Sequence, residues 1–173
     1  MSVIRTARLS LRELIVEDAA FIMELLNEAG FLRHIGDKGV RNLADARNYI
    51  QQGPIESYQR HGFGLYAACL RDDAAAAPLG MCGLVKREGL PDPDLGYAFL
   101  QRHWARGYAV ESAAAVFDYG VHTLKLPRIL AITSPDNPGS IRVLEKVGLK
   151  FDRLIRLMND KHEVQLFRWA SGP

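Results

Sequence analysis

Residues 99–112 read FLQRHWARGYAVES, and this stretch says more about the fold than any other part of the chain. An apolar segment runs into a basic turn, then a glycine, and then a helical pattern. The free N–H groups at a helix N-terminus and the helix dipole both favour an anion there. Arg102 and Arg106 add positive charge, and Gly107 lets the backbone come close to a ligand. The stretch therefore predicts a binding site for the diphosphate of a phosphorylated cofactor.

Two other phosphate-binding motifs differ from this stretch in detail. A Walker loop requires Gly-x4-Gly-Lys-Ser/Thr, which the sequence does not contain. A dinucleotide-binding fingerprint requires three glycines at the start of a helix, and here Gly107 stands alone. The identity of the cofactor therefore depends on the rest of the chain.

Composition limits the class of protein. The 173 residues are 48% hydrophobic and 24% charged, as in a soluble globular protein, and predict a single domain over residues 1–173. A net charge of +2 and the lack of a long apolar run favour no nucleic-acid partner and no membrane partner. Cys69 and Cys82 make no disulfide framework, and the five histidines lack metal-ligand spacing. We therefore expect free thiols, no metal and a cytoplasmic location.

Hydrophobic periodicity predicts, in order, a strand, helices, a three-strand meander, a helix, a strand, a helix and two strands. We expect Asn42 and Asp45 to cap a helix, Gly30 to end the helix before it, and residues 31–41 to form a loop. A hairpin should place Cys69 close to Met81 or Cys82. The expected strands are 9–11 (with Val3), 63–70, 79–86, 95–100, 128–133, 150–157 and 163–169; the expected helices are 19–26, 43–52 with a short helix to 60, 110–124 and 140–147. This order predicts an α/β (α+β) fold with a mixed sheet and helices on both faces.

Several short motifs occur together in this order of elements. They are residues 6–12 (TARLSLR) with 17–19 (EDA), 94–97 (DLGY), 104–109 (WARGYA), 137–140 (NPGS) and 144–149 (LEKVGL). Together they resemble the GCN5-related N-acetyltransferase (GNAT) superfamily, most closely the branch of the ribosomal-protein N-terminal (Rim-type) acetyltransferases. The resemblance covers essentially the whole chain and implies a mostly antiparallel central sheet. Trp104 departs from the usual Gln or Arg, and Leu144 from the tyrosine with which many members protonate the leaving thiolate.

The resemblance implies acetyl-coenzyme A as the cosubstrate. The pantetheine arm would pair with the backbone of Tyr97, Ala98 and Phe99, and Asn137 would hydrogen-bond it or simply cap the next helix. A backbone N–H near Phe99 would polarise the thioester carbonyl. The diphosphate would rest on the backbone of Ala105, Arg106, Gly107, Tyr108, Ala109 and Val110.

Two residues are the candidates for catalysis. Ser140 is either a helix cap or the group that protonates the departing thiolate. Asp94 is the candidate base that takes the proton of the amine, directly or through water, with solvated carboxylates at Glu88, Asp92 and Glu163 as alternatives. No cysteine lies near the motif, so we expect direct attack in a ternary complex rather than a covalent relay.

The expected function is transfer of an acetyl group to a primary amine, either a peptide N-terminus or a small molecule, by a monomer or homodimer. The alternatives are a non-catalytic module that binds or senses acyl-coenzyme A, and a nucleotide-binding protein of another kind. Arg142 and Lys146 share one helix face, which meets a nucleotide phosphate or simply solvent. Candidates for the lining of the acceptor pocket are Phe31, His34, Tyr58 and His61.

Overall fold

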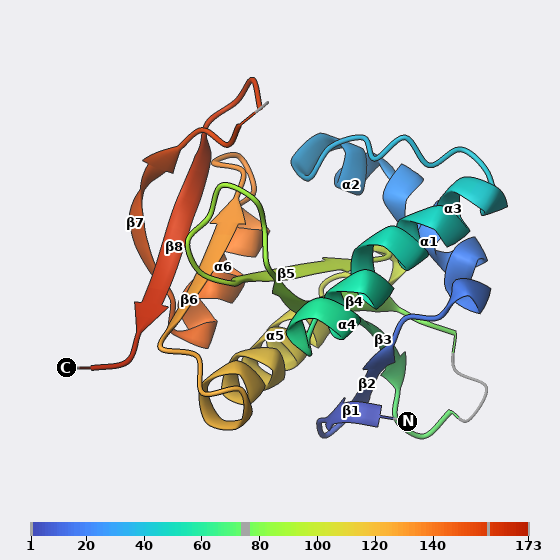
Figure 1. Ribbon diagram of the computed structural model, residues 1–173, viewed down its shortest axis with the longest axis horizontal. Helices are drawn as coiled ribbons and strands as arrows, with labels where there is room; N and C mark the ends of the chain where they lie inside the picture. The colour runs from blue at the N-terminus through green and yellow to red at the C-terminus, as the bar shows by residue number, and fades with distance from the viewer. Residues whose placement is uncertain (1, 74–76, 159, 173) are drawn as a thin grey trace.

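The structure is a computed structural model that describes residues 2–73, 77–158 and 160–172. Within these residues the strands form one eight-stranded sheet in the order β1-β2-β3-β4-β5-β6-β8-β7 (Figure 1). Neighbouring strands are antiparallel except for β5 and β6. The strands are β1 Ser2–Arg5, β2 Leu9–Glu13, β3 Leu65–Leu70, β4 Gly80–Val85, β5 Asp94–Phe99, β6 Arg128–Thr133, β7 Lys150–Ile155 and β8 Val164–Ala170. The expected mixed, mostly antiparallel sheet is confirmed.

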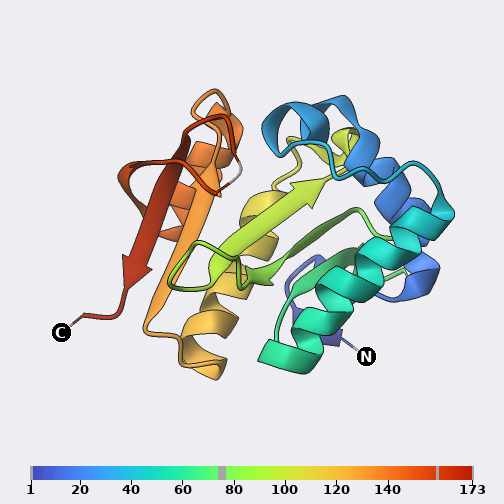
Figure 2. The ribbon, with the colours of Figure 1, turned by 45° about the horizontal axis from the view of Figure 1, so that its top comes forward.

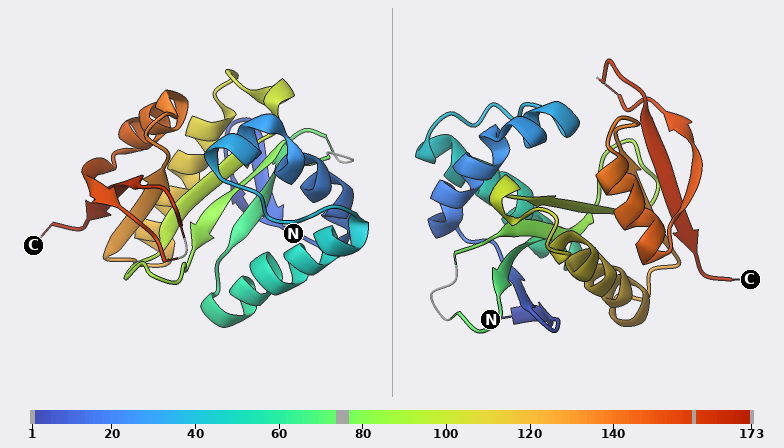
Figure 3. Two further views of the ribbon diagram at one scale, coloured as in Figure 1. Left: turned by 90° about the horizontal axis from the view of Figure 1, so that it is seen from above. Right: turned by 180° about the vertical axis from the view of Figure 1, so that it is seen from behind.

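Helices cover both faces of the sheet, as expected (Figure 3). One face, called here the α3 face, carries the short η1 Val16–Asp18, α1 Ala19–Asn27, α2 Ala29–His34, α3 Leu43–Ile50, the π-helical η2 Gln51–Ile55 and α4 Glu56–His61. The opposite face, called the α5 face, carries α5 Tyr108–Asp118, its π-helical continuation η4 Tyr119–Thr123 and α6 Pro138–Val147. The short η3 Gln101–His103 joins β5 to the turn before α5. No described helix is long and apolar enough to cross a membrane.

The alternation of side chains along each strand divides the core into two main clusters. Cys69 and Met81 pack with α1 and α3 on the α3 face, so that part of the hairpin prediction is confirmed. Cys82 packs on the α5 face instead, so the expected approach of the two cysteines is wrong. Both thiols are free and buried. The reason is the register, in which Met81 is opposite Ala67 and Cys82 is opposite Tyr66.

Strands β5 and β6 pair at one end and then diverge (Figure 2). Their register contains the single pair Asp94 and Leu130, and the Leu130 N–H donates to the Pro93 carbonyl at 2.9 Å. Successive residues of a strand point their backbone groups to opposite edges. Tyr97 and Phe99 therefore present theirs on the β6 side, where the strands have diverged, whereas Ala98 presents its own toward β4. This opening in the sheet is called here the β5–β6 wedge.

Helix α2 corrects the prediction of a loop over residues 31–41. Gly30 does not end α1, which stops at Asn27 because Glu28 is extended, with φ −65° and ψ 145°. Gly30 lies within α2, where an added Cβ would stand 2.5 Å from the Trp104 ring. The helix forms because Phe31 is buried in the core, a tertiary contact that local periodicity does not reveal.

The other boundaries follow the expected ones within a few residues. The Asn42 side chain accepts from the Asp45 N–H at 2.9 Å, which confirms the cap of α3. Val3 belongs to a separate strand, β1, because the chain turns back between Thr6 and Leu9. The segment 43–61 is helical almost throughout and contains a π-helical turn around Pro54.

Candidate active site

The turn from β5 into α5 has the backbone shape that the sequence predicts for an anion site. Ala105 and Gly107 both adopt left-handed conformations, with φ of +57° and +80°. A positive φ is uncommon for alanine, and such residues cluster at functional sites. The first N–H groups of α5, from Tyr108 to Val110, have no intrahelical partner. The backbone of residues 105–110, called here the cradle, therefore carries unpaired donors at an exposed turn.

Arg8 is a residue of this site that sequence reasoning missed. Its Nη1 donates to the Arg106 carbonyl at 2.9 Å, and its guanidinium lies 4.7 Å from the centre of the Tyr108 ring. An added Cβ on Gly107 would stand 3.1 Å from the Arg8 Nη2. Arg8 therefore brings a positive charge to the cradle from a segment about a hundred residues earlier. Only the three-dimensional fold reveals this approach.

Glu111 holds Arg8 in place. Its carboxylate accepts from the Arg8 backbone N–H at 2.8 Å, from the Arg8 Nε at 2.6 Å and from the Thr6 hydroxyl at 2.6 Å. Burial raises the pKa of Glu111, but these hydrogen bonds outweigh it and leave the pKa lowered. The N-terminal hairpin is thereby fixed to the first turn of α5.

The two arginines proposed from the sequence have different positions. Arg106 lies in the cradle with an exposed side chain. Arg102 instead forms an ion pair with Glu24 of α1, and its role at the diphosphate stays a prediction. Glu28 accepts from the Gln101 N–H at 2.9 Å close by. These contacts fix the α1–α2 corner to the segment before the cradle.

Trp104 stabilises the end of β5 rather than taking the place of a charged side chain. Its indole Nε1 donates to the Phe99 carbonyl at 2.7 Å, and its ring lies against Gly30. One acceptor at the wedge edge is therefore already satisfied. The Phe99 N–H and the backbone groups of Tyr97 remain on that edge.

A pair of hydroxyl groups meets at the N-terminus of α6. The Tyr97 and Ser140 hydroxyl oxygens are 2.8 Å apart, and the Tyr97 hydroxyl also donates to the Ser140 carbonyl at 3.0 Å. Burial raises the pKa of Tyr97, while its hydrogen bond with Ser140 opposes the rise, so the phenol stays neutral. Sequence reasoning used only the backbone of Tyr97 and missed its side chain. The place of Tyr97 in the DLGY motif of residues 94–97 is the feature of the sequence that could have indicated a role for its side chain.

Asn137 caps α6 through its side-chain oxygen, which accepts from the Ser140 N–H at 3.2 Å. The capping alternative is thus confirmed, and the amide nitrogen has no recorded bond among the described residues. Leu144, where many GNAT members have tyrosine, is buried in the core at 1% exposure. The hydroxyl groups near the wedge therefore come from β5 and from the start of α6.

Asp94 is brought to the α3 face at the first residue of β5. It is 1% exposed, and its two carboxylate oxygens each lie 3.3 Å from a nitrogen of Arg87, Nε for one and Nη2 for the other. Burial raises the pKa of Asp94, and the charge of Arg87 partly opposes this rise. A proton acceptor at Asp94 would have to act from inside this ion pair.

The remaining candidates make no recorded hydrogen bond or ion pair with Tyr97 or Ser140 among the described residues. Glu88 and Glu163 are exposed, and Asp92 pairs with Arg128 at 2.8 Å. Residues 142 and 146 are exposed on α6.

The four residues proposed to line the acceptor pocket have different environments. Phe31 is in the core, and the Tyr58 hydroxyl donates to the Leu65 carbonyl. His34 lies 3.6 Å from Asp136, and His61 lines a cavity. Across the described ranges, no group of three or more His, Cys, Asp or Glu side chains is placed to hold a metal.

Comparisons with known proteins agree with this geometry. The family model described as "Acetyltransferase (GNAT) domain" matches residues 8–150. YkkB, an uncharacterized protein of Bacillus subtilis, is 31% identical over 157 residues, covering 89% of this chain and 88% of that protein. The uncharacterized N-acetyltransferase YnaD of the same species is 27% identical over 147 residues, with coverages of 85% and 82%. The structure of RimL, a ribosomal L7/L12 α-N-protein acetyltransferase in complex with coenzyme A, is 17% identical with a TM-score of 0.81, covering 98% of each chain.

The chain therefore belongs to the GNAT family and is an acetyl-coenzyme A-dependent acyltransferase. The likeness to RimL supports the same fold, and the acceptor of that enzyme remains a statement about RimL.

Proposed function

We propose that this protein, acting as a single acetyltransferase domain, transfers an acetyl group from acetyl-coenzyme A to a primary amine by direct attack in a ternary complex. The observation that carries the proposal is the pair of Ser140 and Tyr97 hydroxyls, 2.8 Å apart beside the same wedge that ends in the cradle. A binding module needs the cradle alone, whereas acyl transfer also needs hydrogen-bond donors for the sulfur that leaves. The acceptor is a peptide N-terminus or a small molecule.

The cradle fits the cosubstrate. Backbone donors of residues 105–110 and the charge of Arg8 suit a diphosphate. The free backbone groups of Tyr97 and Phe99 suit the amides of a pantetheine arm, because a ligand can pair there as an added strand. The Asn137 amide nitrogen is a further donor at the opposite side of the wedge. When bound, acetyl-coenzyme A supplies an activated acetyl thioester.

The hydroxyl pair would stabilise the leaving sulfur rather than act as a strong acid. A free thiol has a pKa of about 8.5, so its thiolate leaves without complete protonation near neutral pH. Ser140 can donate a hydrogen bond to the sulfur when the Tyr97 hydroxyl donates its proton to the Ser140 Oγ instead of to the Ser140 carbonyl. The incoming amine would lose its proton to water or to a carboxylate, for which Asp94 is the sequence-based candidate.

Release of coenzyme A tests the proposal. Purified protein would be mixed with acetyl-coenzyme A and a panel of peptides and small amines, and free thiol would be followed. We expect thiol release that depends on one class of amine. Thermal stabilisation by coenzyme A, about 2.7 kcal/mol at a hundred times its dissociation constant, checks the cofactor in parallel. Stabilisation by ATP or NAD in place of coenzyme A would contradict the proposal.

Ser140→Ala tests the hydroxyl pair. We expect kcat to fall about 5- to 50-fold, a discounted general-acid contribution because the leaving group is already a good one. Affinity for coenzyme A should stay nearly unchanged, since Ser140 lies beyond the cradle. Steady-state kinetics and a melting temperature, measured on one preparation, distinguish a catalytic role of Ser140 from a helix-capping role. A destabilised variant with wild-type kcat would mean that Ser140 serves only the helix.

Asn137→Asp separates the two roles of Asn137. Aspartate retains the side-chain oxygen that caps α6, so the melting temperature should change little. It lacks the amide donor and adds a negative charge at the wedge, so coenzyme A affinity should fall about tenfold, or 1.4 kcal/mol. Titration calorimetry gives the affinity. Unchanged affinity in Asn137→Asp would assign Asn137 to capping alone.

A further inference from the structure

The ion pair of Asp94 and Arg87 has the form of an oriented binding group. The Asp94 side chain is 1% exposed, and the Arg87 side chain is 35% exposed. The carboxylate engages Nε and Nη2, which is one edge of the guanidinium. Among the described residues the Arg87 Nη1 takes part in none of the recorded hydrogen bonds or ion pairs. A buried aspartate therefore fixes the arginine while both N–H donors of Nη1 stay free.

This arginine is held by Asp94 on the α3 face of β5. Asp94 alternates with Leu95 and Tyr97, which pack on the α5 face, so its side chain is on the α3 face. Tyr97 is three residues further along the strand, about 10 Å away at 3.3 Å per residue. The Tyr97 hydroxyl itself lies on the α5 face, so an acceptor held by Arg87 would reach it through the β5–β6 wedge.

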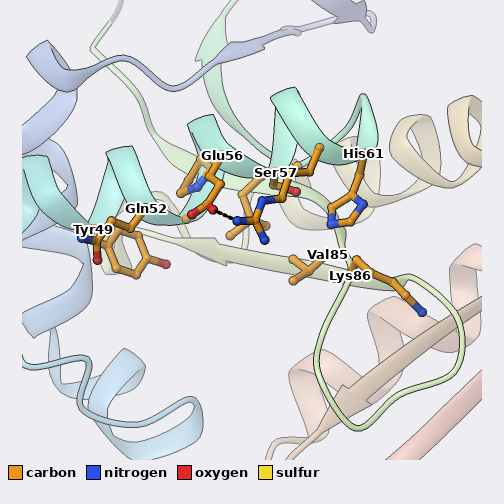
Figure 4. A pocket seen from close by; sticks show the side chains of 12 residues that line it. Tyr49, Gln52, Glu56, Ser57, His61, Val85 and Lys86 are labelled. Atoms are coloured by element: carbon orange, nitrogen blue, oxygen red, sulfur yellow. Dashed lines mark ion pairs between the residues drawn. The ribbon is translucent and has the colours of Figure 1, made fainter.

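A cavity of about 300 Å³ lies on the same face, between the helical segment 43–61 and strands β3 and β4 (Figure 4). Val85, which is opposite Asp94 in the sheet, and Lys86 form part of its lining. Tyr49, another lining residue, is within electrostatic reach of Arg87. The cavity and the oriented arginine are thus adjacent parts of one surface.

Two cations, Arg87 and Lys38, lie within electrostatic reach of each other at this surface, with Asp94 and Asp160 as acidic neighbours. Asp94 is paired with Arg87, and Glu56 of the cavity wall is paired with Arg60. Lys38, from the segment between α2 and α3, is within electrostatic reach of both Arg87 and Asp160. Burial lowers the pKa of Lys38, and the like charge of Arg87 lowers it further. A carboxylate on the acceptor would be attracted by both Arg87 and Lys38.

We propose that Arg87, positioned by the buried Asp94, binds a carboxylate on the acceptor, so that the preferred substrates are amines with a carboxylate within about 10 Å of the nitrogen. An extended peptide with an acidic residue at its second or third position has this chemistry. A free acidic amino acid is a small molecule that carries the same combination of an amine and a nearby carboxylate. The inference rests on the proposed function and adds the acceptor class to it. Asp94 then acts as a positioning residue rather than as the base.

Matched peptides that differ only at position two test the inference. Thiol release would be measured with acceptors beginning Ala-Glu, Ala-Gln and Ala-Lys, and with free glutamate. We expect kcat/KM for the glutamate peptide to exceed that for the glutamine peptide at least tenfold, and the lysine peptide to be poorest. Activity with free glutamate in place of the peptides would identify the small-molecule source.

Three variants test whether Arg87 causes the preference for acidic acceptors. Arg87→Gln should bring the glutamate and glutamine peptides within about twofold of each other, mainly through a higher KM for the acidic peptide. Asp94→Asn should reduce the preference in the same way, because an asparagine no longer holds Arg87 through an ion pair. Arg128→Gln is the matched control, because Arg128 pairs with Asp92 of the same loop at 2.8 Å, and its preference should equal that of the wild type.

Three outcomes would overturn the inference. Equal use of acidic and neutral peptides would do so while leaving acetyl transfer intact. An acidic preference that persists in Arg87→Gln would assign it to other residues. A uniform loss of kcat for every acceptor in Asp94→Asn would make Asp94 the base. Absence of thiol release with every amine would instead remove the proposed function and this inference together.

Discussion

Gly107→Val should weaken the binding of coenzyme A tenfold or more, equivalent to about 1.4 kcal/mol. The backbone at Gly107 has φ +80°, which a β-branched residue rarely adopts. An added Cβ would also stand 3.1 Å from the Arg8 Nη2, so the branched side chain would displace Arg8. Both effects disturb the donors that would meet the diphosphate. Titration calorimetry with coenzyme A measures the change.

Gly62→Val controls for backbone strain. Gly62 has φ +75°, and no atom lies within 4 Å of its added Cβ. The variant should lose stability through strain comparable to that at Gly107, yet bind coenzyme A with wild-type affinity. If a folded Gly107→Val bound coenzyme A as tightly as Gly62→Val does, the cradle would not be the diphosphate site.

Gly83→Ala should be the most damaging single change to the fold. Its Cβ would lie 1.9 Å from the Gly64 carbonyl oxygen and 2.8 Å from the Leu65 Cα, and both are backbone atoms of the neighbouring segment. Overpacking commonly costs about 1–3 kcal/mol, and a clash with backbone belongs at or above the upper end of that range. We therefore expect a loss of about 3 kcal/mol or more in the free energy of unfolding, measured by urea denaturation.

The control for this change is Gly53→Ala. Gly53 lies in the π-helical turn η2, and its added Cβ meets nothing within 4 Å. Its free energy of unfolding should change by no more than about 0.5 kcal/mol in either direction. Similar stabilities for the two variants would show that β3 and β4 are not packed as closely as the structure places them.

The sheet was predictable because its strands have clear alternation and its motifs are local. Helix α2 was not, because six residues with one buried aromatic side chain give no helical period. Its position depends on contacts with Trp104 and Asp136 from distant parts of the chain. The same reason explains Gly30, whose small size serves the close approach of Trp104 and not the end of a helix.

Some residues of the candidate site could likewise be predicted from the sequence, and others could not. The turn at Gly107 and the start of α6 at Asn137 could be located from the sequence because each is one continuous segment. Arg8, which lies beside Gly107, and the Tyr97 side chain, which meets Ser140, could not, since each partner is brought in by the sheet. Arg102 shows the opposite case, because this basic residue lies next to the predicted phosphate-binding turn but forms an ion pair with Glu24 of α1.

Mass spectrometry of the acceptor tests acetyl transfer to an amine most directly. The protein would be incubated with acetyl-coenzyme A and the amine that gives the strongest thiol release, and both products would be quantified. Transfer to the amine predicts one acetylated nitrogen for each coenzyme A released, with no acetyl group left on the protein. Tight binding of coenzyme A with neither product formed would contradict it and would indicate a module that only binds acyl-coenzyme A.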